Sequence, residues 1–461
     1  MNAATRVSRD LDVRQAYARD ASGLELVPDA VARPSEVPEV EALLREATAT
    51  KTPVTPAGAQ SSTTGASIAD HGVLLSLRGL DRVLDLDRPA RSIRVEAGVL
   101  VADVRRAAEA EGLLFTPDPT SEEECTVGGA VTCNASGARS LRYGATGPHV
   151  RALTVVLANG ETHELRRPML EKNTVGYPVA HDPVDWFVGS EGTLGVVVAA
   201  EFALHPLPSQ VLGLAVPFAN ESDALAFVVA ARRDGAVHAR CLEYFDALAF
   251  VIAREANGNT AWAPDAQALV YLEETGAHET DDTELPLDAW LSLAESHHAH
   301  TSEIRVYDSP AALRDARRIR HAIPATMNAR GAACRPFGGR KVSTDWAVPY
   351  PRLAEALLRA RAIADAHGVP QAVAYGHAGN GHPHQNFIAH DADELHRIDA
   401  VVEATLREVL AMGGTVAAEH GIGKLKRRWL PMQASALQLR AMRALKRELD
   451  PLGLLAPGNV L

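Results

Sequence analysis

Three loops of small residues in the N-terminal half constrain most strongly what this 461-residue chain can fold into. They span residues 56–66, 126–137 and 189–195 and consist mainly of glycine, alanine, serine and threonine. Small residues let a backbone approach a bulky anion closely, and successive N–H groups there form a concave anion site. None is a P-loop, and none carries G-x-G-x-x-G at a strand–helix junction. We therefore expect a large nucleotide cofactor here, of a kind that the loops alone do not identify.

The residue pattern around these loops predicts alternating strands and helices. Residues 73–77 and 92–97 are typical of strands, whereas residues 35–49 are typical of a helix with Ser35 as its N-cap. The pair Asn159-Gly160 is a hairpin signal, so we expect a strand before it and a returning strand over residues 161–165.

The pattern changes near residue 209. Strands are predicted at 211–217 and 268–273, and long amphipathic helices at 353–367 and 395–412. The chain is too long for one ordinary core, so we expect an α+β fold with more than one domain. The expected parts are an N-terminal helix and connector (1–30), a cofactor-binding domain (31–209), a substrate or cap domain (210–415) and a C-terminal segment (416–461).

Composition excludes some classes of protein. The formal net charge is -12, whereas a general nucleic-acid binder needs a basic surface. Four cysteines without a C-x-x-C pair argue against an iron–sulfur cluster and favour reduced thiols in the cytoplasm. We expect no signal peptide in the mixed-charge residues 1–20 and no transmembrane segment, with peripheral attachment to the inner membrane left open.

The loops also support a family resemblance. The first loop, residues 117–144 and residues 186–195 resemble, in order, the FAD-binding domain of the vanillyl-alcohol-oxidase and p-cresol-methylhydroxylase flavoprotein superfamily. More narrowly, they resemble its D-lactate, glycolate and D-2-hydroxyglutarate dehydrogenase branch. The resemblance implies a two-part FAD-binding domain, an α+β cap domain with an antiparallel sheet, and a C-terminal segment that returns to the FAD domain. It implies FAD contacts from Pro56, Gly58, Ala59, Gln60, Ser61, Ser62, Thr64, Gly65, Pro117, Gly128, Gly129, Asn134, Ser136, Gly137, Gly144, Glu191, Gly192 and Gly195.

The chain departs from the family pattern in the first loop and in the tail. Relatives usually have three glycines where this chain has Gly58-Ala59-Gln60, so extra side chains crowd that turn. The loop lacks the histidine that some relatives link to flavin, which predicts noncovalent FAD. Ala456 replaces the usual asparagine and removes one expected contact.

Histidines around a second turn signal suggest a metal site. Asn380-Gly381 predicts a two-residue hairpin tip, which sets His377 opposite His384. Directly opposed residues share a face with Cβ atoms roughly 5 Å apart, so the two imidazoles can converge on one ion. His382 lies on the same face. We expect it to be either a spare metal ligand or a hydrogen-bond donor to one of the ligands.

A third ligand should be a carboxylate or another histidine, and Glu419-His420 offers both types. This pair resembles the glutamate–histidine signature of the same family. The resemblance assigns His377, His384 and Glu419 to a divalent metal, zinc first with manganese or iron as alternatives, and His420 to the catalytic base. An imidazole titrates near neutral pH, which suits removal of a hydroxyl proton. Relatives usually have Asp and Asn at positions 380 and 382, so Asn380 removes one negative charge near the ion.

A 2-hydroxy acid also needs a cation for its carboxylate, and arginine offers the best fork. The helical run 314–320 contains four arginines, most of which we expect on a solvated face. By resemblance, Arg320 and Lys341 match the family's carboxylate-binding cations, and Pro324 stands where some relatives have a hydroxyl residue. The segment 343–345 is closest to the D-lactate type.

Together these residues predict FAD-dependent oxidation of a small, D-lactate-like 2-hydroxy acid, assisted by the metal and a His base. Two alternatives stay open. One is a metal-independent flavin oxidase or alkyl-transferring flavoenzyme of the same superfamily, and the other is a noncatalytic ligand-binding relative. The electron acceptor is a cytochrome, a quinone, an electron-transfer flavoprotein or oxygen. The substrate's stereochemistry and the oligomeric state, a homodimer or another, also stay open.

Overall fold

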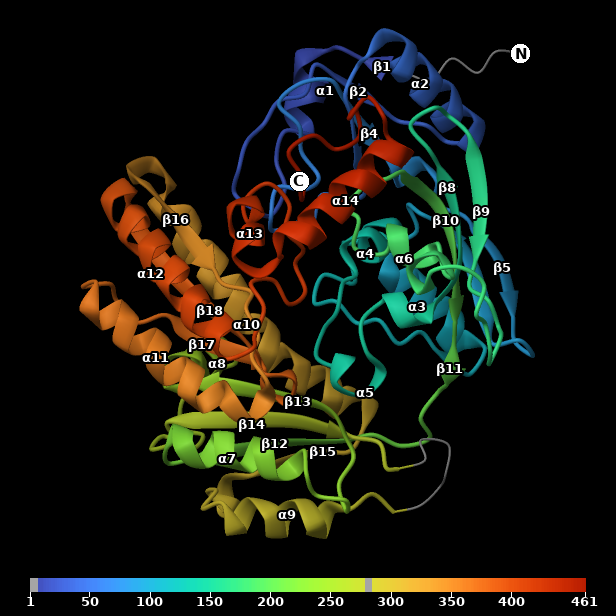
Figure 1. Ribbon diagram of the computed structural model, residues 1–461. Coiled ribbons are helices and arrows are strands. Elements are labelled where there is room, and N and C mark those ends of the chain that lie inside the picture. The colour runs from blue at the N-terminus through green and yellow to red at the C-terminus, as the bar shows by residue number, and fades with distance from the viewer. Residues whose placement is uncertain (1–6, 278–283) are drawn as a thin grey trace. The chain divides into compact units, whose positions relative to one another are not determined.

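The computed structural model describes residues 7–277 and 284–461, which form two compact units (Figure 1). The first unit runs to Gly137, resumes from Gly144 to Leu207 and ends with Glu419–Leu461. The second contains Ala138–Tyr143 and Pro208–Ala418. Both units combine helices with largely antiparallel sheets, so the predicted α+β class is confirmed. In the described part of the chain no helix is both long and apolar enough to cross a bilayer.

The first unit contains two main sheets and a short ladder. In the first sheet, β2 and β3 each pair in parallel with β4, and β1 pairs antiparallel with β2. The second sheet is antiparallel throughout. In spatial order the strands are β1 (Val7–Ser8), β2 (Ala30–Ala32), β4 (Val73–Ser76) and β3 (Val54–Ala57); then β5 (Val83–Asp87), β6 (Ser92–Glu96), β10 (Val196–Ala203), β8 (Val150–Val156) and β9 (Thr162–Arg166); and the ladder β11 (His205–Pro206) with β7 (Leu113–Leu114).

Helices of the first unit pack on these sheets through regularly spaced apolar residues. In α2 the buried positions are Val40, Leu43, Leu44 and Ala47, which recur at helical spacing. The predicted cap of α2 was wrong: Glu36 is the N-cap residue. The helices are α1 (Leu11–Ala16), α2 (Val37–Thr50), α3 (Val101–Ala110), α4 (Val127–Cys133), α6 (Val184–Phe187), α13 (Leu430–Gln433) and α14 (Ala436–Leu449).

The second unit is built on one seven-stranded antiparallel sheet. Central strands such as β14 are buried along their whole length because helices cover both faces. In spatial order the strands are β15 (Arg305–Tyr307), β12 (Leu212–Phe218), β14 (Ala268–Glu274), β13 (Ala239–Asp246), β17 (Val373–His377), β18 (His382–Asp391) and β16 (Gly338–Ser343). The helices are α5 (Ser140–Tyr143), α7 (Glu221–Ala231), α8 (Ala247–Ala256), α9 (Leu287–Ser296), α10 (Pro310–Cys334), α11 (Leu353–Ala366) and α12 (Ala392–Ala411).

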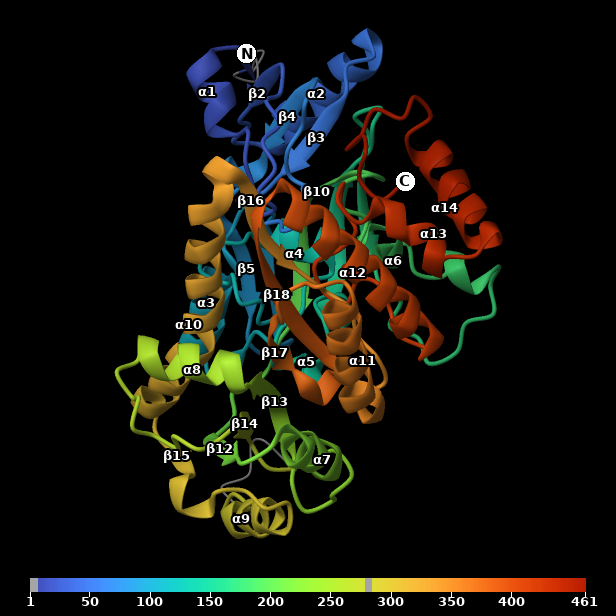
Figure 2. The same cartoon turned by 90° about the vertical axis from the view of Figure 1, so that its left-hand side faces the viewer.

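Helices α8 and α10 lie on one side of this sheet, and α7, α11 and α12 lie on the other (Figure 2). The core beneath α10 includes Ile319 and Ile323 from the helix and Tyr271 and Tyr375 from the sheet. Because alternate residues of a strand point to one face, His377 shares the α10 side with Tyr375. The α10 face of the sheet therefore carries the polar residues that the sequence singled out.

Candidate functional site

The first small-residue loop follows β3 in the first unit and is braced by the side chain of a glutamine. Gln60 adopts a left-handed conformation, with φ 58°, and its side-chain Nε2 donates to the carbonyls of Tyr17 (2.9 Å) and Ser67 (3.1 Å). The amide therefore braces the loop against the N-terminal segment. The crowding expected from Gln60 is thus relieved because its side chain is committed to these two carbonyls.

The backbone of this loop fits an anionic group. Within the described residues, the N–H groups of Ala59 and residues 60–63 donate to no protein acceptor. Ser62 Oγ accepts from the N–H groups of Thr64 and Ala66, at 3.2 Å each, and so fixes the end of the loop. Backbone donors without protein acceptors are rare unless water or a ligand satisfies them, so the loop suits a pyrophosphate.

The second loop leads into α4, where close packing requires glycine. A Cβ atom on Gly128 would lie 2.7 Å from that of Ala97, and one on Gly137 would lie 2.1 Å from the carbonyl oxygen of Asp118. Asn134 ends α4 in the left-handed region, at φ 53°, and its Oδ1 accepts from the N–H of Gly147. All residues expected to contact FAD lie in the first unit, on these loops and the flanking segments.

The third loop is hydrogen-bonded to the C-terminal segment through Glu191. Its buried carboxylate accepts from the N–H groups of Ile422 and Gly423, both at 2.7 Å. Burial raises the pKa of Glu191. Glu191, predicted to contact FAD, thus also anchors the backbone directly after His420.

The chain terminus adds a second anchor to the cofactor loops. Asn459 Nδ2 donates to the carbonyls of Ala66 (2.8 Å) and Glu191 (3.2 Å), and Lys424 Nζ donates to Asn459 Oδ1 at 2.7 Å. Ala456 contributes its backbone, whose N–H donates to the carbonyl of Val54. The tail therefore joins the first and third loops, although Ala456 itself brings no polar side chain.

Glu419 and His420 also belong to the first unit. The Glu419 carboxylate accepts from Ser136 Oγ at 3.3 Å, and its other oxygen lies 3.3 Å from His420 Nε2. The carbonyl of His420 accepts from Thr64 Oγ1 at 3.4 Å. The predicted base is thus tied to the first loop through its backbone, and its side chain stays a quarter exposed.

The predicted register of the histidine hairpin was wrong. His377 pairs with His382, and His384 pairs with Tyr375. The turn is not two residues long: it spans residues 378–381 and closes with a bond from the Gly381 N–H to the Ala378 carbonyl at 2.9 Å. His384 still shares a face with His377, because a displacement of two residues along a strand preserves the side.

The hairpin brings three buried histidines together within the second unit. The ring centroids of His377 and His384 are 5.3 Å apart, those of His377 and His382 are 5.5 Å apart, and those of His382 and His384 are 4.6 Å apart. One ring nitrogen from each lies within 4.8 Å of the others. Convergent imidazoles at this spacing fit a divalent metal ion.

Two predicted site residues meet at a buried carboxylate that the sequence analysis missed. Glu243 on β13 lies 2.6 Å from Nδ1 of His377 and accepts from Nε of Arg320 at 2.9 Å. Burial alone would raise the pKa of Glu243, but the charges of His377 and Arg320 outweigh it and lower the value to about 2. The one sequence signal was an acid in the apolar strand 241–245.

The predicted cations differ in their surroundings. Arg320 is buried on α10, and its guanidinium carbon lies 4.7 Å from the ring centroid of Tyr375. Lys341 on β16 donates to Asn328 at 2.6 Å, and burial lowers its pKa. Arg318 pairs with Asp315 on the surface, as expected for a solvated face. Pro324 lies inside α10.

Two more residues of this face escaped the sequence analysis. Asp345 lies 3.2 Å from Nε2 of His382, and its carbonyl accepts from the Ala418 N–H at 2.7 Å. Asn386 is buried on β18, on the same face as His382 and His384, and its side-chain amide has no hydrogen-bond partner among the described residues. The alternation His382, His384, Asn386 could have revealed Asn386, whereas nothing in the sequence near Asp345 indicates its neighbour.

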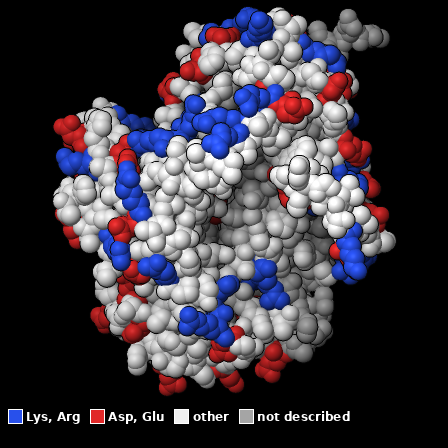
Figure 3. Space-filling model, viewed as in Figure 1, with Lys and Arg blue, Asp and Glu red and all other residues white. Residues whose placement is uncertain are grey.

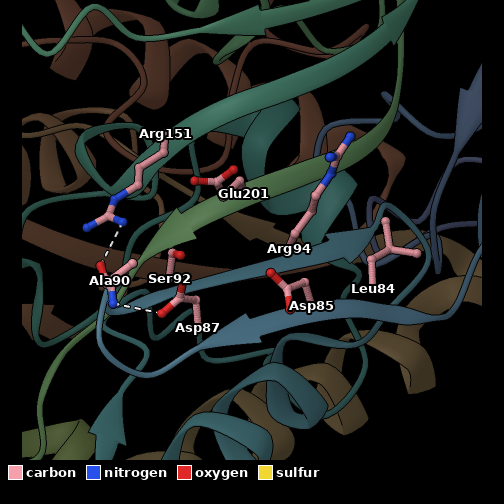
Figure 4. Close-up of a pocket in the computed structure, with 8 residues that line it drawn as sticks. All are labelled: Leu84, Asp85, Asp87, Ala90, Ser92, Arg94, Arg151 and Glu201. Carbon is pink, nitrogen blue, oxygen red and sulfur yellow. Dashed lines mark hydrogen bonds between the residues drawn. The ribbon is translucent and has the colours of Figure 1, made fainter.

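A surface hollow of about 430 Å³ lies elsewhere, against strands β5, β6 and β10 (Figure 4). Its charged side chains are engaged locally: Glu201 pairs with Arg166, and Arg151 donates to the carbonyl of Ala90. Acidic and basic side chains are likewise interspersed over the face of the molecule in Figure 3. We assign no chemistry to this hollow.

Comparisons with known proteins match both halves of the chain. The family model for FAD linked oxidases, C-terminal domain, matches residues 207–460, and the FAD binding domain model matches residues 28–166. D-2-hydroxyglutarate dehydrogenase of Xanthomonas citri pv. viticola is 33% identical over 445 residues, which cover 94% of this chain and 89% of the relative.

Two further relatives act on named hydroxy acids. Glycolate oxidase subunit GlcD of Bacillus subtilis is 29% identical, with 97% of this chain and 92% of the relative covered. D-lactate dehydrogenase of Anaerostipes hadrus is 28% identical, with 94% and 89% covered. Among solved structures, alkyldihydroxyacetonephosphate synthase is similar with a TM-score of 0.73 and 17% identity, over 98% of this chain and 82% of that one, which supports the fold.

Proposed function

Since the chain belongs to the FAD-linked oxidases, with the D-lactate, glycolate and D-2-hydroxyglutarate dehydrogenases as relatives, we propose that it oxidises a small 2-hydroxy acid, D-lactate-like, to the 2-oxo acid. The observation that carries this proposal is the shared contact of Glu243 with Arg320 and His377. One carboxylate thereby fixes a candidate anion-binding group and a candidate metal ligand on the same sheet face.

Arg320 and Lys341 would bind the substrate carboxylate. Glu243 orients the guanidinium of Arg320 through Nε, and a guanidinium is the group best suited to a fork-like contact with a carboxylate. Lys341 lies on the same α10 side of the sheet and adds a point charge. Because Arg320 is buried, its attraction for an anion is less screened than at the surface, whereas Lys341 is partly exposed.

His377, His384 and Glu419 would hold the divalent ion, zinc first with manganese or iron as alternatives. The Ala418 N–H donates to the carbonyl of Asp345, whose side chain lies beside His382. Glu419 is the next residue along the chain. When bound, such an ion polarises the substrate hydroxyl and lowers its pKa.

His420 would take the hydroxyl proton on a ring nitrogen. Its backbone is fixed by Thr64, and the turn after it is fixed by Glu191. The small-residue loops would hold noncovalent FAD, which would supply the acceptor for the hydride from C2 of the substrate. The residues expected to bind FAD and the base lie in the first unit and the acid-binding residues in the second, so the reaction draws on both.

The onward acceptor is a cytochrome, a quinone, an electron-transfer flavoprotein or oxygen. None of the four cysteines is part of a disulfide, which fits a reducing compartment such as the cytoplasm.

A panel of D- and L-2-hydroxy acids tests the proposal. Each acid is mixed anaerobically with the flavin-loaded protein, and loss of the oxidised flavin band is recorded. We expect D-lactate or a close analogue to bleach the flavin, and chelator treatment to abolish the bleaching. Bleaching that survives the chelator would favour a metal-independent oxidase or alkyl-transferring enzyme. A protein without flavin absorption would favour a ligand-binding relative.

A further inference from the structure

We infer that His382 is a third imidazole ligand, so that the second unit by itself presents a three-histidine metal site with one coordination position open for substrate. This inference rests on the proposed metal function and changes its ligand set. The family resemblance implied a metal site of two histidines and one glutamate. The hairpin of this chain adds the side chain of a third histidine.

The first support is the position of the His382 ring. It lies nearer to His384 than the His377 ring does, with centroid distances of 4.6 Å and 5.3 Å. Ligand nitrogens of a tetrahedral zinc ion, each bonded at about 2.0–2.1 Å, are roughly 3.4 Å apart. The nitrogens here lie within 4.8 Å of one another, so modest side-chain rotation brings all three into range.

The second support is a carboxylate behind each of two rings. Glu243 lies 2.6 Å from one nitrogen of His377, and Asp345 lies 3.2 Å from one nitrogen of His382. Metal-binding histidines typically present one nitrogen to a carboxylate and the other to the ion. Asp345 is buried, so water screens its contact with His382 only weakly.

The third support is that the backbone makes room for these rings. The four-residue turn sets His382 directly opposite His377, with both side chains on the α10 face. Gly376 has φ 128°, and a Cβ atom there would lie 2.9 Å from the ring of His384. The absence of a side chain at Gly376 therefore leaves room for the ring of His384 within the cluster.

A three-imidazole site has consequences for metal choice. Imidazole carries no charge, so the ligand set in the second unit is neutral and rich in nitrogen. Such a set favours zinc, cobalt, nickel or copper over manganese and magnesium, which prefer oxygen.

Zinc binding to the flavin-loaded protein tests the inference without any turnover. Zinc affinity is measured by calorimetric competition with a chelator, and the number of imidazole ligands is read from zinc X-ray absorption. We expect three imidazoles in the natural protein and in Glu419→Gln. We expect His382→Asn to show two imidazoles and an affinity lower by at least about tenfold, the scale set by loss of a supporting partner alone.

His390→Asn is the matched control, because His390 lies on the same strand but is exposed and pairs with Glu394. It should leave both readouts unchanged. Two imidazoles in the natural protein, or unchanged affinity in His382→Asn, would overturn the role of His382 while the metal function stands. Absence of zinc, cobalt and manganese binding by the natural protein would overturn both. The imidazole count in the natural protein needs no variant, so a misfolded variant cannot mask the outcome.

Discussion

The carboxylate of Glu243 lies 2.6 Å from Nδ1 of His377, and both side chains are buried. The same carboxylate accepts from Arg320, so one acid from β13 orients a candidate metal ligand and a candidate substrate-binding group. The permanently charged guanidinium of Arg320 favours the ionised carboxylate of Glu243. Glu243 would act by positioning these two residues rather than by exchanging a proton.

Replacement of this acid should lower activity more than it lowers stability when shape is kept. In Glu243→Gln an acceptor oxygen remains, but its charge is lost, so we expect metal affinity and kcat/KM to fall by about 10–100-fold. Glu243→Ala should be worse, because an uncompensated buried arginine costs about 3–5 kcal/mol. Steady-state kinetics and zinc titration measure both effects. Glu408→Gln, at an exposed ion pair with Arg359, is the control, and equal losses in the two Gln variants would contradict the role of Glu243.

Substrate binding should weaken at alkaline pH because of Lys341. Burial lowers the pKa of this lysine below its usual 10.5, so its ammonium loses charge at a lower pH than an exposed lysine does. The charged form binds the carboxylate, so KM should rise as pH increases through that lowered pKa. Lys341→Arg should remove the rise, because the guanidinium stays charged.

Lys341→Met should have a high KM at every pH, with kcat changed less. Arg340→Met, the preceding residue on the opposite face of β16, is the matched control. A KM profile in Lys341→Met that coincides with the natural one would rule out the contact. KM and kcat are measured from pH 6 to pH 10 with the acid that bleaches the flavin best.

Gln60 should support FAD binding although it replaces a small residue. Its amide makes two hydrogen bonds, each worth on the order of 1 kcal/mol, that hold the loop with the free backbone donors. We expect Gln60→Ala to weaken FAD binding by about tenfold, measured by titration of flavin-free protein. Gln371→Ala, at an exposed glutamine of the second unit, should not change it. An unaltered FAD affinity in Gln60→Ala would mean that the brace is dispensable.

Much of the cofactor half could be predicted because its signals are local. A loop that needs close backbone approach selects small residues in one short stretch, as at residues 56–66 and 126–137. The loops therefore indicated a large nucleotide cofactor, and the family resemblance implied that it is FAD. The brace from Gln60 to Tyr17 was not predictable, since a side-chain bond across 43 positions leaves no pattern in sequence.

The histidine site could be predicted only in outline. Alternation along β18 places His382 and His384 on one face, and their convergence with His377 survived because the predicted register was wrong by two residues, which preserves the face. The turn length was misjudged because Asn380-Gly381 favours a two-residue loop, whereas a four-residue turn closes at Gly381. Glu243 pairs with His377 across neighbouring strands 134 positions apart, and only the sheet order reveals that contact.

We propose that this protein transfers a hydride from a 2-hydroxy acid to FAD with His420 as the base. Anaerobic stopped-flow mixing with D-lactate, followed at the flavin absorption band, tests it most directly. The natural protein should bleach, whereas His420→Ala should retain FAD and bleach at least about 100-fold more slowly, as expected for loss of a general base. Bleaching of His420→Ala at the rate of the natural protein would rule out His420 as the base.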